Sequence, residues 1–142
     1  MTAAHRPQAC ICRVLIADDR ARTRRAVRAV LALQPGIELI GEAADGEEAI
    51  AAVERLRPDI VIIDVRMPRL DGIAATALIK ARWPDIRVVA HSLAEELSGD
   101  ALAAGADAFV PKGVPADELL RALHALHVGP MTLARATHEA YS

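Results

Sequence analysis

Acidic or basic side chains follow directly after three short apolar runs of the sequence. The run at 14–17 is followed by Asp18 and Asp19, the run at 60–63 by Asp64, and the run at 108–110, after one proline, by Lys112. If these runs are neighbouring parallel strands, three carboxylates and one ammonium meet at one edge of a sheet. Carboxylates 4 Å apart repel by roughly 4 kcal/mol per pair at an effective dielectric of about 20. Such a cluster needs a cation, and its oxygen ligands suit Mg²⁺, which indicates phosphoryl chemistry on an aspartate.

Strand-like runs alternate with helical patterns along most of the chain. Strands are predicted at 13–17, 37–43, 60–63, 87–91 and 108–110, and helices at 21–33, 46–56, 72–82, 94–104 and 116–127. The run IVII at 60–63 is apolar throughout, as expected for a strand covered on both faces. Five βα units in alternation predict a single α/β domain with a parallel sheet, right-handed crossovers and helices on both faces. Ligands of such sheets bind beyond the carboxyl ends of the strands, where the acids, Ser92 and Lys112 fall.

Composition limits the possible classes of protein. A chain of 142 residues is most economically one domain, and 53% hydrophobic residues favour a packed globule. A net charge of −2 gives no general attraction to nucleic acid or anionic lipid. No apolar run approaches the roughly 20 residues that span a bilayer, and no segment resembles a secretory signal. A cytoplasmic protein without membrane contact is expected.

Two segments flank the expected domain. Residues 1–12 show no clear period and are predicted to form a flexible N-terminal leader, whereas 13–128 form the domain. The sequence Val128-Gly129-Pro130-Met131 breaks the last helix, so 129–142 are expected to be a tail or the start of a linker.

Cysteine and histidine give no recognisable metal motif in the sequence. Cys10 and Cys12 are too close for an unstrained bridge, and no second Cys or His pair stands at zinc-finger spacing. We expect two ordinary reduced thiols, and we expect His124 and His127 to be surface or amphipathic-face residues of the last helix.

Four features together resemble the receiver domain of bacterial two-component response regulators, over about residues 13–128. They are the acid pair, the stretch IIDVRMPRLDG, Ser92 at the end of the fourth strand, and AGADAFVPKG with Phe109 and Lys112. The residues around Lys112, with Gly113 where many receivers have proline, are most similar to the branch that usually bears a helix-turn-helix output domain. The resemblance implies a flavodoxin-like, doubly wound (βα)5 fold with strand order 2-1-3-4-5.

The resemblance also implies a role for each site residue. Asp64 would accept a phosphoryl group from a phosphohistidine of a sensor histidine kinase or from a small acyl phosphate. Asp18 and Asp19, with Asp64 and the backbone carbonyl of Arg66, would hold Mg²⁺, and Lys112 would pair with the acyl-phosphate oxygens. Outside such a motif, an aspartate after a strand is more often a helix N-cap.

Conformational signalling is implied for two further residues. Ser92 would bond a phosphoryl oxygen and draw the following loop inward, and Phe109 occupies the aromatic switch position, although it can equally be a plain core residue. Leu93 stands where the family usually has Ala or Gly, and we expect it to alter the rate of phosphorylation or hydrolysis. Phosphorylation-dependent homodimerisation remains open.

The helix at 21–33 and its start are unusually basic. A solvated helix face is the preferred interpretation, and kinase docking through Arg20, Arg24 and Arg28 is the second. Nucleic-acid binding is disfavoured because no aromatic residues interleave with these arginines.

Several functions other than a phosphorylated switch are possible for such a fold. A receiver-like interaction module independent of phosphate should have lost the acids and the lysine, yet all are present. An aspartate-nucleophile phosphatase needs a second carboxylate where the chain has Arg20, and a flavin phosphate would be repelled by Asp18 and Asp19. We therefore expect no enzymatic activity beyond gain and loss of one phosphoryl group, in a stand-alone receiver or an N-terminal fragment of a DNA-binding transcriptional regulator.

Overall fold

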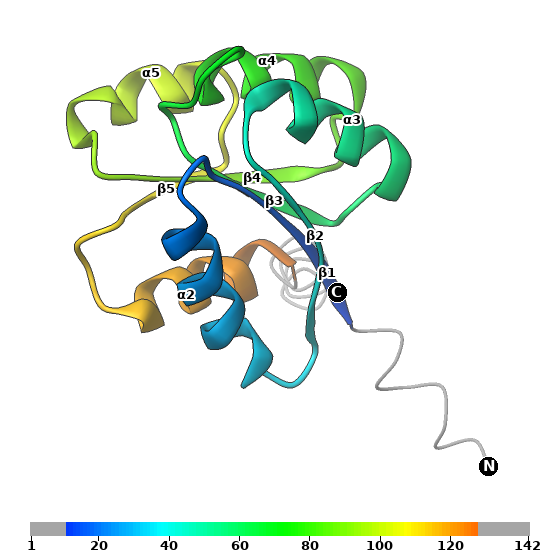
Figure 1. Cartoon of the computed structure of the whole chain (residues 1–142), viewed down its shortest axis with the longest axis vertical. Helices are drawn as coiled ribbons and strands as arrows, with labels where there is room; N and C mark the ends of the chain where they lie inside the picture. Colours follow the sequence, from blue (N-terminus) through cyan, green and yellow to red (C-terminus); the bar gives the residue numbers. More distant parts are fainter. Residues whose placement is uncertain (1–10, 128–142) are drawn as a thin grey trace, which may run out of the picture.

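A computed structural model describes residues 11–127, which form three layers with a sheet in the middle (Figure 1). The strands are β1 (Cys12–Ala17), β2 (Ile37–Ala43), β3 (Ile60–Ile63), β4 (Arg87–Ser92) and β5 (Ala108–Pro111). All neighbouring pairs are parallel, in the order β2-β1-β3-β4-β5. The predicted doubly wound, flavodoxin-like fold with order 2-1-3-4-5 is confirmed.

Helices cover both faces of the sheet. One face carries α3 (Gly46–Leu56), α4 (Gly72–Arg82) and α5 (Ser98–Ala103), and the other carries α2 (Ala21–Ala32) and the helix of residues 116–127 (Figure 1). We call the helix of residues 116–127 the final helix because it is the last helix in the described part of the chain. Because successive strand residues point to opposite faces, Leu15 and Ala17 pack under the first group of helices, whereas Val14 and Ile16 pack against the second.

The central strand is buried as its composition predicts. All four residues of β3, IVII, are at most 1% exposed. Two separate clusters of aliphatic side chains therefore form the core, one on each side of the sheet. This dense packing fixes the carboxyl ends of β1 and β3 next to each other, with Ala17 opposite Ile63.

Element boundaries differ from the predicted ones in a few places. β1 begins one residue earlier, at Cys12, while Ser92 and Pro111 pair with each other and extend β4 and β5. The helix predicted over 94–104 is instead a 3₁₀ turn, η2 (Glu95–Leu97), followed by the short α5. Leu97 has φ −98° and ψ 8°, outside the α-helical region, and the following Ser-Gly pair disfavours a continuous helix.

The start of α4 is pressed against the loop that follows β3. Asp71 caps this helix by accepting a hydrogen bond from the Ala74 N–H at 2.8 Å. The Gly72 N–H donates to the carbonyl of Val65 at 2.7 Å, and a Cβ on Gly72 would lie only 1.9 Å from the carbonyl oxygen of Asp64. Glycine is therefore needed here, and the contact fixes the backbone of Asp64.

Most of the predicted leader and the whole predicted tail lie outside the described residues, so these domain boundaries stay predictions. Among residues 11–127, none of the helices has the length and apolar character needed to cross a membrane.

Candidate functional site

Lys112 joins the first and third strands at their carboxyl ends. Its Nζ lies 2.7 Å from Asp18 Oδ2 and 2.9 Å from Asp64 Oδ2. Both aspartates are buried, at 2% and 7% exposure, and they directly follow β1 and β3. The structure thus brings together three of the side chains that the sequence singled out.

Asp19 completes an acidic cluster with Asp18 and Asp64. One carboxylate oxygen from each lies within 4.8 Å of the others, and Asp19 is the exposed member. An all-oxygen donor set open to solvent on one side fits Mg²⁺, which keeps several waters when proteins bind it. The residues present are therefore compatible with the predicted ion.

Burial and charge oppose each other in this cluster. Burial raises the pKa of the Asp18 carboxyl above its ordinary value, although the hydrogen bonds from Lys112 and the Arg20 N–H act in the other direction. For Lys112, burial alone would lower the pKa, but hydrogen bonds to Asp18 and Asp64 outweigh it and the pKa is raised. The lysine is thus held as a cation beside two buried carboxyl groups.

The loop after β3 orients the Asp64 side chain. Its Oδ2 accepts from Lys112, and its Oδ1 accepts a long hydrogen bond of 3.3 Å from the Arg66 N–H. This bond places the backbone of Arg66 beside the carboxylate, whereas the predicted role of the Arg66 carbonyl as a ligand stays a prediction.

A polar cavity of about 340 Å³ opens beside the acidic cluster. Its lining includes Asp19, Asp64, Ser92 and Lys112. The Ser92 hydroxyl oxygen accepts a hydrogen bond from the Ala94 N–H at 3.1 Å. Leu93 also lines this cavity and is 63% exposed, so its side chain stands beside the phosphoacceptor candidate.

Phe109 is half-buried in β5 and packs against the core cluster under α3, α4 and α5. Its ring therefore contacts the core, as expected for a plain core residue. Its role as a switch stays a prediction.

The arginines near the start of α2 have different surroundings. Arg20 lines the polar cavity, while Arg24 donates to the Asp18 carbonyl at 2.6 Å and to Glu42 at 3.0 Å. Arg28 forms a second ion pair with Glu42. Arg24 is thus engaged within the domain, and it fixes the backbone of Asp18. The sequence alone did not indicate the ion pair that holds Arg24, because Glu42 lies on a different element.

His91 lies in β4 with its side chain largely out of contact with solvent. Burial, together with the nearby Lys112 charge, lowers its pKa to about 4. Its Nδ1 is buried without a hydrogen-bond partner among the described residues. The imidazole is therefore neutral near pH 7.

Comparison with known proteins agrees with this fold. The family model described as the response regulator receiver domain matches residues 14–124. The chain belongs to the family of response regulator receiver domains.

Relatives of this chain include an enzyme and a response regulator. The chain is 41% identical over 103 residues to a protein-glutamate methylesterase/protein-glutamine glutaminase of Alkalilimnicola ehrlichii, covering 70% of this chain and 26% of the relative. It is 33% identical over 125 residues to the nitrate/nitrite response regulator protein NarL of Escherichia coli, covering 87% of this chain and 58% of that protein. The chain thus spans a quarter to somewhat over half the length of these relatives.

A solved structure also matches well. The crystal structure of the CheX-CheY-BeF3-Mg²⁺ complex from Borrelia burgdorferi aligns with a TM-score of 0.73 and 32% sequence identity. The match covers 80% of this chain and 88% of that chain.

Proposed function

We propose that this chain is a phosphorylation-controlled switch in which Asp64 accepts a phosphoryl group. The observation that carries the proposal is the Lys112 ammonium, held within 2.9 Å of both Asp18 and Asp64 at the wall of a polar cavity. A lone aspartate after a strand would serve as a helix cap, but here Asp71 caps the next helix instead. The Asp64 carboxylate is therefore available for chemistry.

The transfer itself needs few groups. A carboxylate oxygen of Asp64 attacks the phosphorus of a phosphohistidine or of a small acyl phosphate, and a P–O bond forms as the bond to the donor breaks. The electron pair of the broken bond stays with the leaving imidazole or carboxylate. Lys112 then exchanges its contact with Asp64 for a phosphoryl oxygen, as a compact ammonium on a flexible stem allows.

Mg²⁺ would be held by Asp18, Asp19, Asp64 and the backbone carbonyl of Arg66. When bound, it supplies charge neutralisation for the transferring group. Arg24 keeps Asp18 in place through its backbone carbonyl, and Gly72 does the same for Asp64 by close packing. The relative from Borrelia burgdorferi, with beryllium fluoride and Mg²⁺ in its complex, supports this assignment.

Signalling would follow from a new hydrogen bond that the Ser92 hydroxyl donates to a phosphoryl oxygen. Ser92 now accepts from the Ala94 N–H, and a phosphoryl oxygen would draw its hydroxyl toward Asp64. The loop from Leu93 to η2 would move with it, and Phe109 would respond from the neighbouring strand. The change is a population shift between two packings and needs about 5.5 kcal/mol to move from 1:99 to 99:1.

We expect a sensor histidine kinase as donor in the cytoplasm, with Arg20, Arg24 and Arg28 as candidate docking residues. The chain would neither bind nucleic acid directly nor contact the membrane, and it would catalyse nothing beyond its own phosphorylation and dephosphorylation. Phosphorylation would also be able to drive homodimerisation. An output domain, as in a DNA-binding regulator, is compatible with the chain's partial coverage of NarL.

Intact-mass spectrometry after treatment with acetyl phosphate and Mg²⁺ tests the proposal. We expect one phosphoryl adduct on the wild type and on an Asp100→Asn control, and none on Asp64→Asn. Equal adducts on wild type and Asp64→Asn would remove Asp64 as the acceptor. A folded wild type without any adduct would favour an interaction module that works without phosphate.

A further inference from the structure

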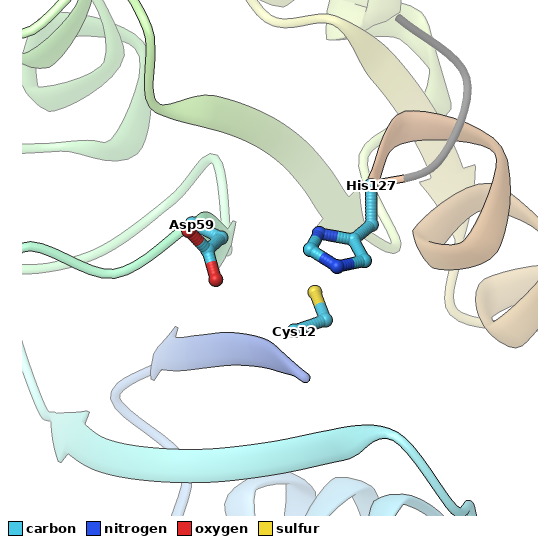
Figure 2. A group of neighbouring side chains, drawn as sticks. All are labelled: Cys12, Asp59 and His127. Atoms are coloured by element: carbon cyan, nitrogen blue, oxygen red, sulfur yellow. The ribbon is translucent and has the colours of Figure 1, made fainter. Parts of the chain in front are cut away.

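Cys12, Asp59 and His127 meet at the edge of the sheet opposite the acidic cluster. Cys12 starts β1, Asp59 directly precedes β3, and His127 lies at the end of the described part of the final helix. One sulfur, one carboxylate oxygen and one ring nitrogen lie within 4.8 Å of one another. Figure 2 shows the Cys12 sulfur directed to the imidazole of His127, with an Asp59 oxygen facing the same space.

This donor set differs in kind from the one at the acidic cluster. A thiolate, an imidazole and a carboxylate are ligands of Zn²⁺, whereas Mg²⁺ prefers oxygen alone. From the convergence of these three donors we propose that Cys12, Asp59 and His127 form a Zn²⁺-binding site, with water as the fourth ligand.

The distances are close to those that a zinc ion requires. Tetrahedral ligands at about 2.0–2.3 Å from zinc lie roughly 3.3–3.8 Å from one another. The donors here need to close by at most about 1.5 Å, which rotation of the partly exposed Asp59 and His127 side chains can provide. The site is therefore nearly preformed.

Two hydrogen bonds between Asp59 and Arg13, one of them to the Asp59 carboxylate, hold two of the three ligands in register. The Asp59 N–H donates to the Arg13 carbonyl, and the Arg13 N–H donates to Asp59 Oδ2, both at 2.8 Å. Asp59 is thus tied to the residue that follows Cys12. Such supporting bonds orient ligands and lower the reorganisation needed on metal binding.

An ion can reach the site from solvent. Cys12 is only 2% exposed, but Asp59 and His127 line a cavity of about 290 Å³ open to the surface. Asp85 and Arg87 also line this cavity and offset each other in charge. The buried Cys12 thiol would bind the ion from the protein side, and Asp59 and His127 would bind it from the side that faces the cavity.

A reactive cysteine is the competing interpretation. Burial and the neighbouring Asp59 charge raise the pKa of the Cys12 thiol to about 12. The metal-free thiol is therefore protonated and poorly nucleophilic near neutral pH, which disfavours catalysis or redox sensing. Burial is the larger cause of the raised pKa, and the Asp59 carboxylate, the second cause, is itself a donor for a cation.

A bound zinc ion would connect β1, the loop before β3 and the final helix. These segments are distant in sequence, so the ion would fix the end of the final helix to the sheet. The site lies away from Asp64 and does not depend on the function proposed for it.

Metal content of the full chain, freed of any affinity tag, tests the site. After dialysis against Zn²⁺ with excess Mg²⁺, the wild type should retain one zinc per chain, and Zn²⁺ should raise the melting temperature by roughly 10 °C at a hundredfold excess over Kd. His127→Gln and Asp59→Asn should lose both effects. His124→Gln, an exposed neighbour on the same helix, is the matched control and should keep them.

Cobalt substitution identifies the sulfur. We expect Co²⁺ to give a thiolate-to-metal charge-transfer band with the wild type and with Cys10→Ser, and none with Cys12→Ser. Unchanged zinc content in His127→Gln would overturn the proposal. So would a wild type that binds no zinc, or a band that disappears in Cys10→Ser and persists in Cys12→Ser. If Cys12→Ser does not fold, the comparison of His127→Gln with His124→Gln still decides.

Discussion

Two buried carboxylates share one ammonium at the carboxyl edge of this sheet. Lys112 lies 2.7 Å from Asp18 and 2.9 Å from Asp64, so the position of each side chain depends on the charges of the other two. Removing one partner of a buried ion pair typically costs about 3–5 kcal/mol, because the remaining charge is left uncompensated. A phosphoryl group on Asp64 would replace a carboxylate with a stronger acceptor in the same place, and Lys112 would follow it.

His91 should make the protein less stable in mild acid. Its pKa is lowered from 6.5 to about 4 by burial and by Lys112, so the unfolded chain binds more protons than the folded one between these values. Stability is full above pH 6.5 and falls as the pH decreases toward 4. At pH 5 the loss is about 2 kcal/mol, from the 1.36 kcal/mol that one pKa unit represents.

Urea unfolding at pH 7 and pH 5 measures this loss. The free energy of unfolding of the wild type should be lower at pH 5 than at pH 7, and in His91→Gln this loss should be smaller by about 2 kcal/mol. It should be unchanged in His124→Gln, whose side chain is exposed. If His91→Gln loses as much unfolding free energy between pH 7 and pH 5 as the wild type, the acid sensitivity comes from other groups.

Leu93 is expected to slow the reactions of Asp64. Its side chain is 63% exposed and lines the cavity beside Asp64, so it stands in the path of an incoming phosphoryl donor. If it adds about 1 kcal/mol to the barrier, Leu93→Ala should phosphorylate about fivefold faster with acetyl phosphate. Leu102→Ala, also exposed but on α5, is the control. Equal rates in all three proteins would show that Leu93 does not obstruct the site.

At the scale of elements, the site depends on how closely α4 approaches the loop after β3. A Cβ on Gly72 would lie 1.9 Å from the Asp64 carbonyl oxygen, so Gly72→Ala should displace the loop and destabilise the fold by about 1–3 kcal/mol. Gly99 has open space at the same position, and Gly99→Ala in α5 should be neutral or stabilise by about 0.5–1 kcal/mol. Chemical denaturation measures both. Equal effects would mean that the contact at Gly72 relaxes without cost.

Most elements could be predicted from the sequence because local signals agreed with the tertiary context. IVII predicted a strand buried on both faces, and β3 is one. The prediction of a single helix over 94–104 was wrong. Composition does not show that the backbone angles of Leu97 lie outside the helical region just before Ser98. Such a break depends on the tertiary packing of the loop after β4, and tertiary packing cannot be predicted from a local sequence pattern.

Contacts between residues far apart in sequence limit how much of the site can be predicted from the sequence. Asp18, Asp64 and Lys112 could be predicted to meet because each follows a strand of a parallel sheet. The contact of Arg24 with Glu42 and the approach of Cys12 to His127 join positions on different elements that no motif links. Such contacts appear only once the sheet order and the helix packing are known.

For the whole molecule, Mg²⁺ should stabilise the folded chain, because a ligand that binds only the folded state adds about 1.4 kcal/mol at ten times its Kd. For a domain of this size the melting temperature should rise by about 5 °C. Asp19 belongs to the acidic cluster yet is exposed, so Asp19→Asn should fold normally and lose most of this increase. Asp100→Asn should keep it, and a chelator should reverse it. An equal Mg²⁺-dependent increase in Asp19→Asn and wild type would place the ion elsewhere on the protein.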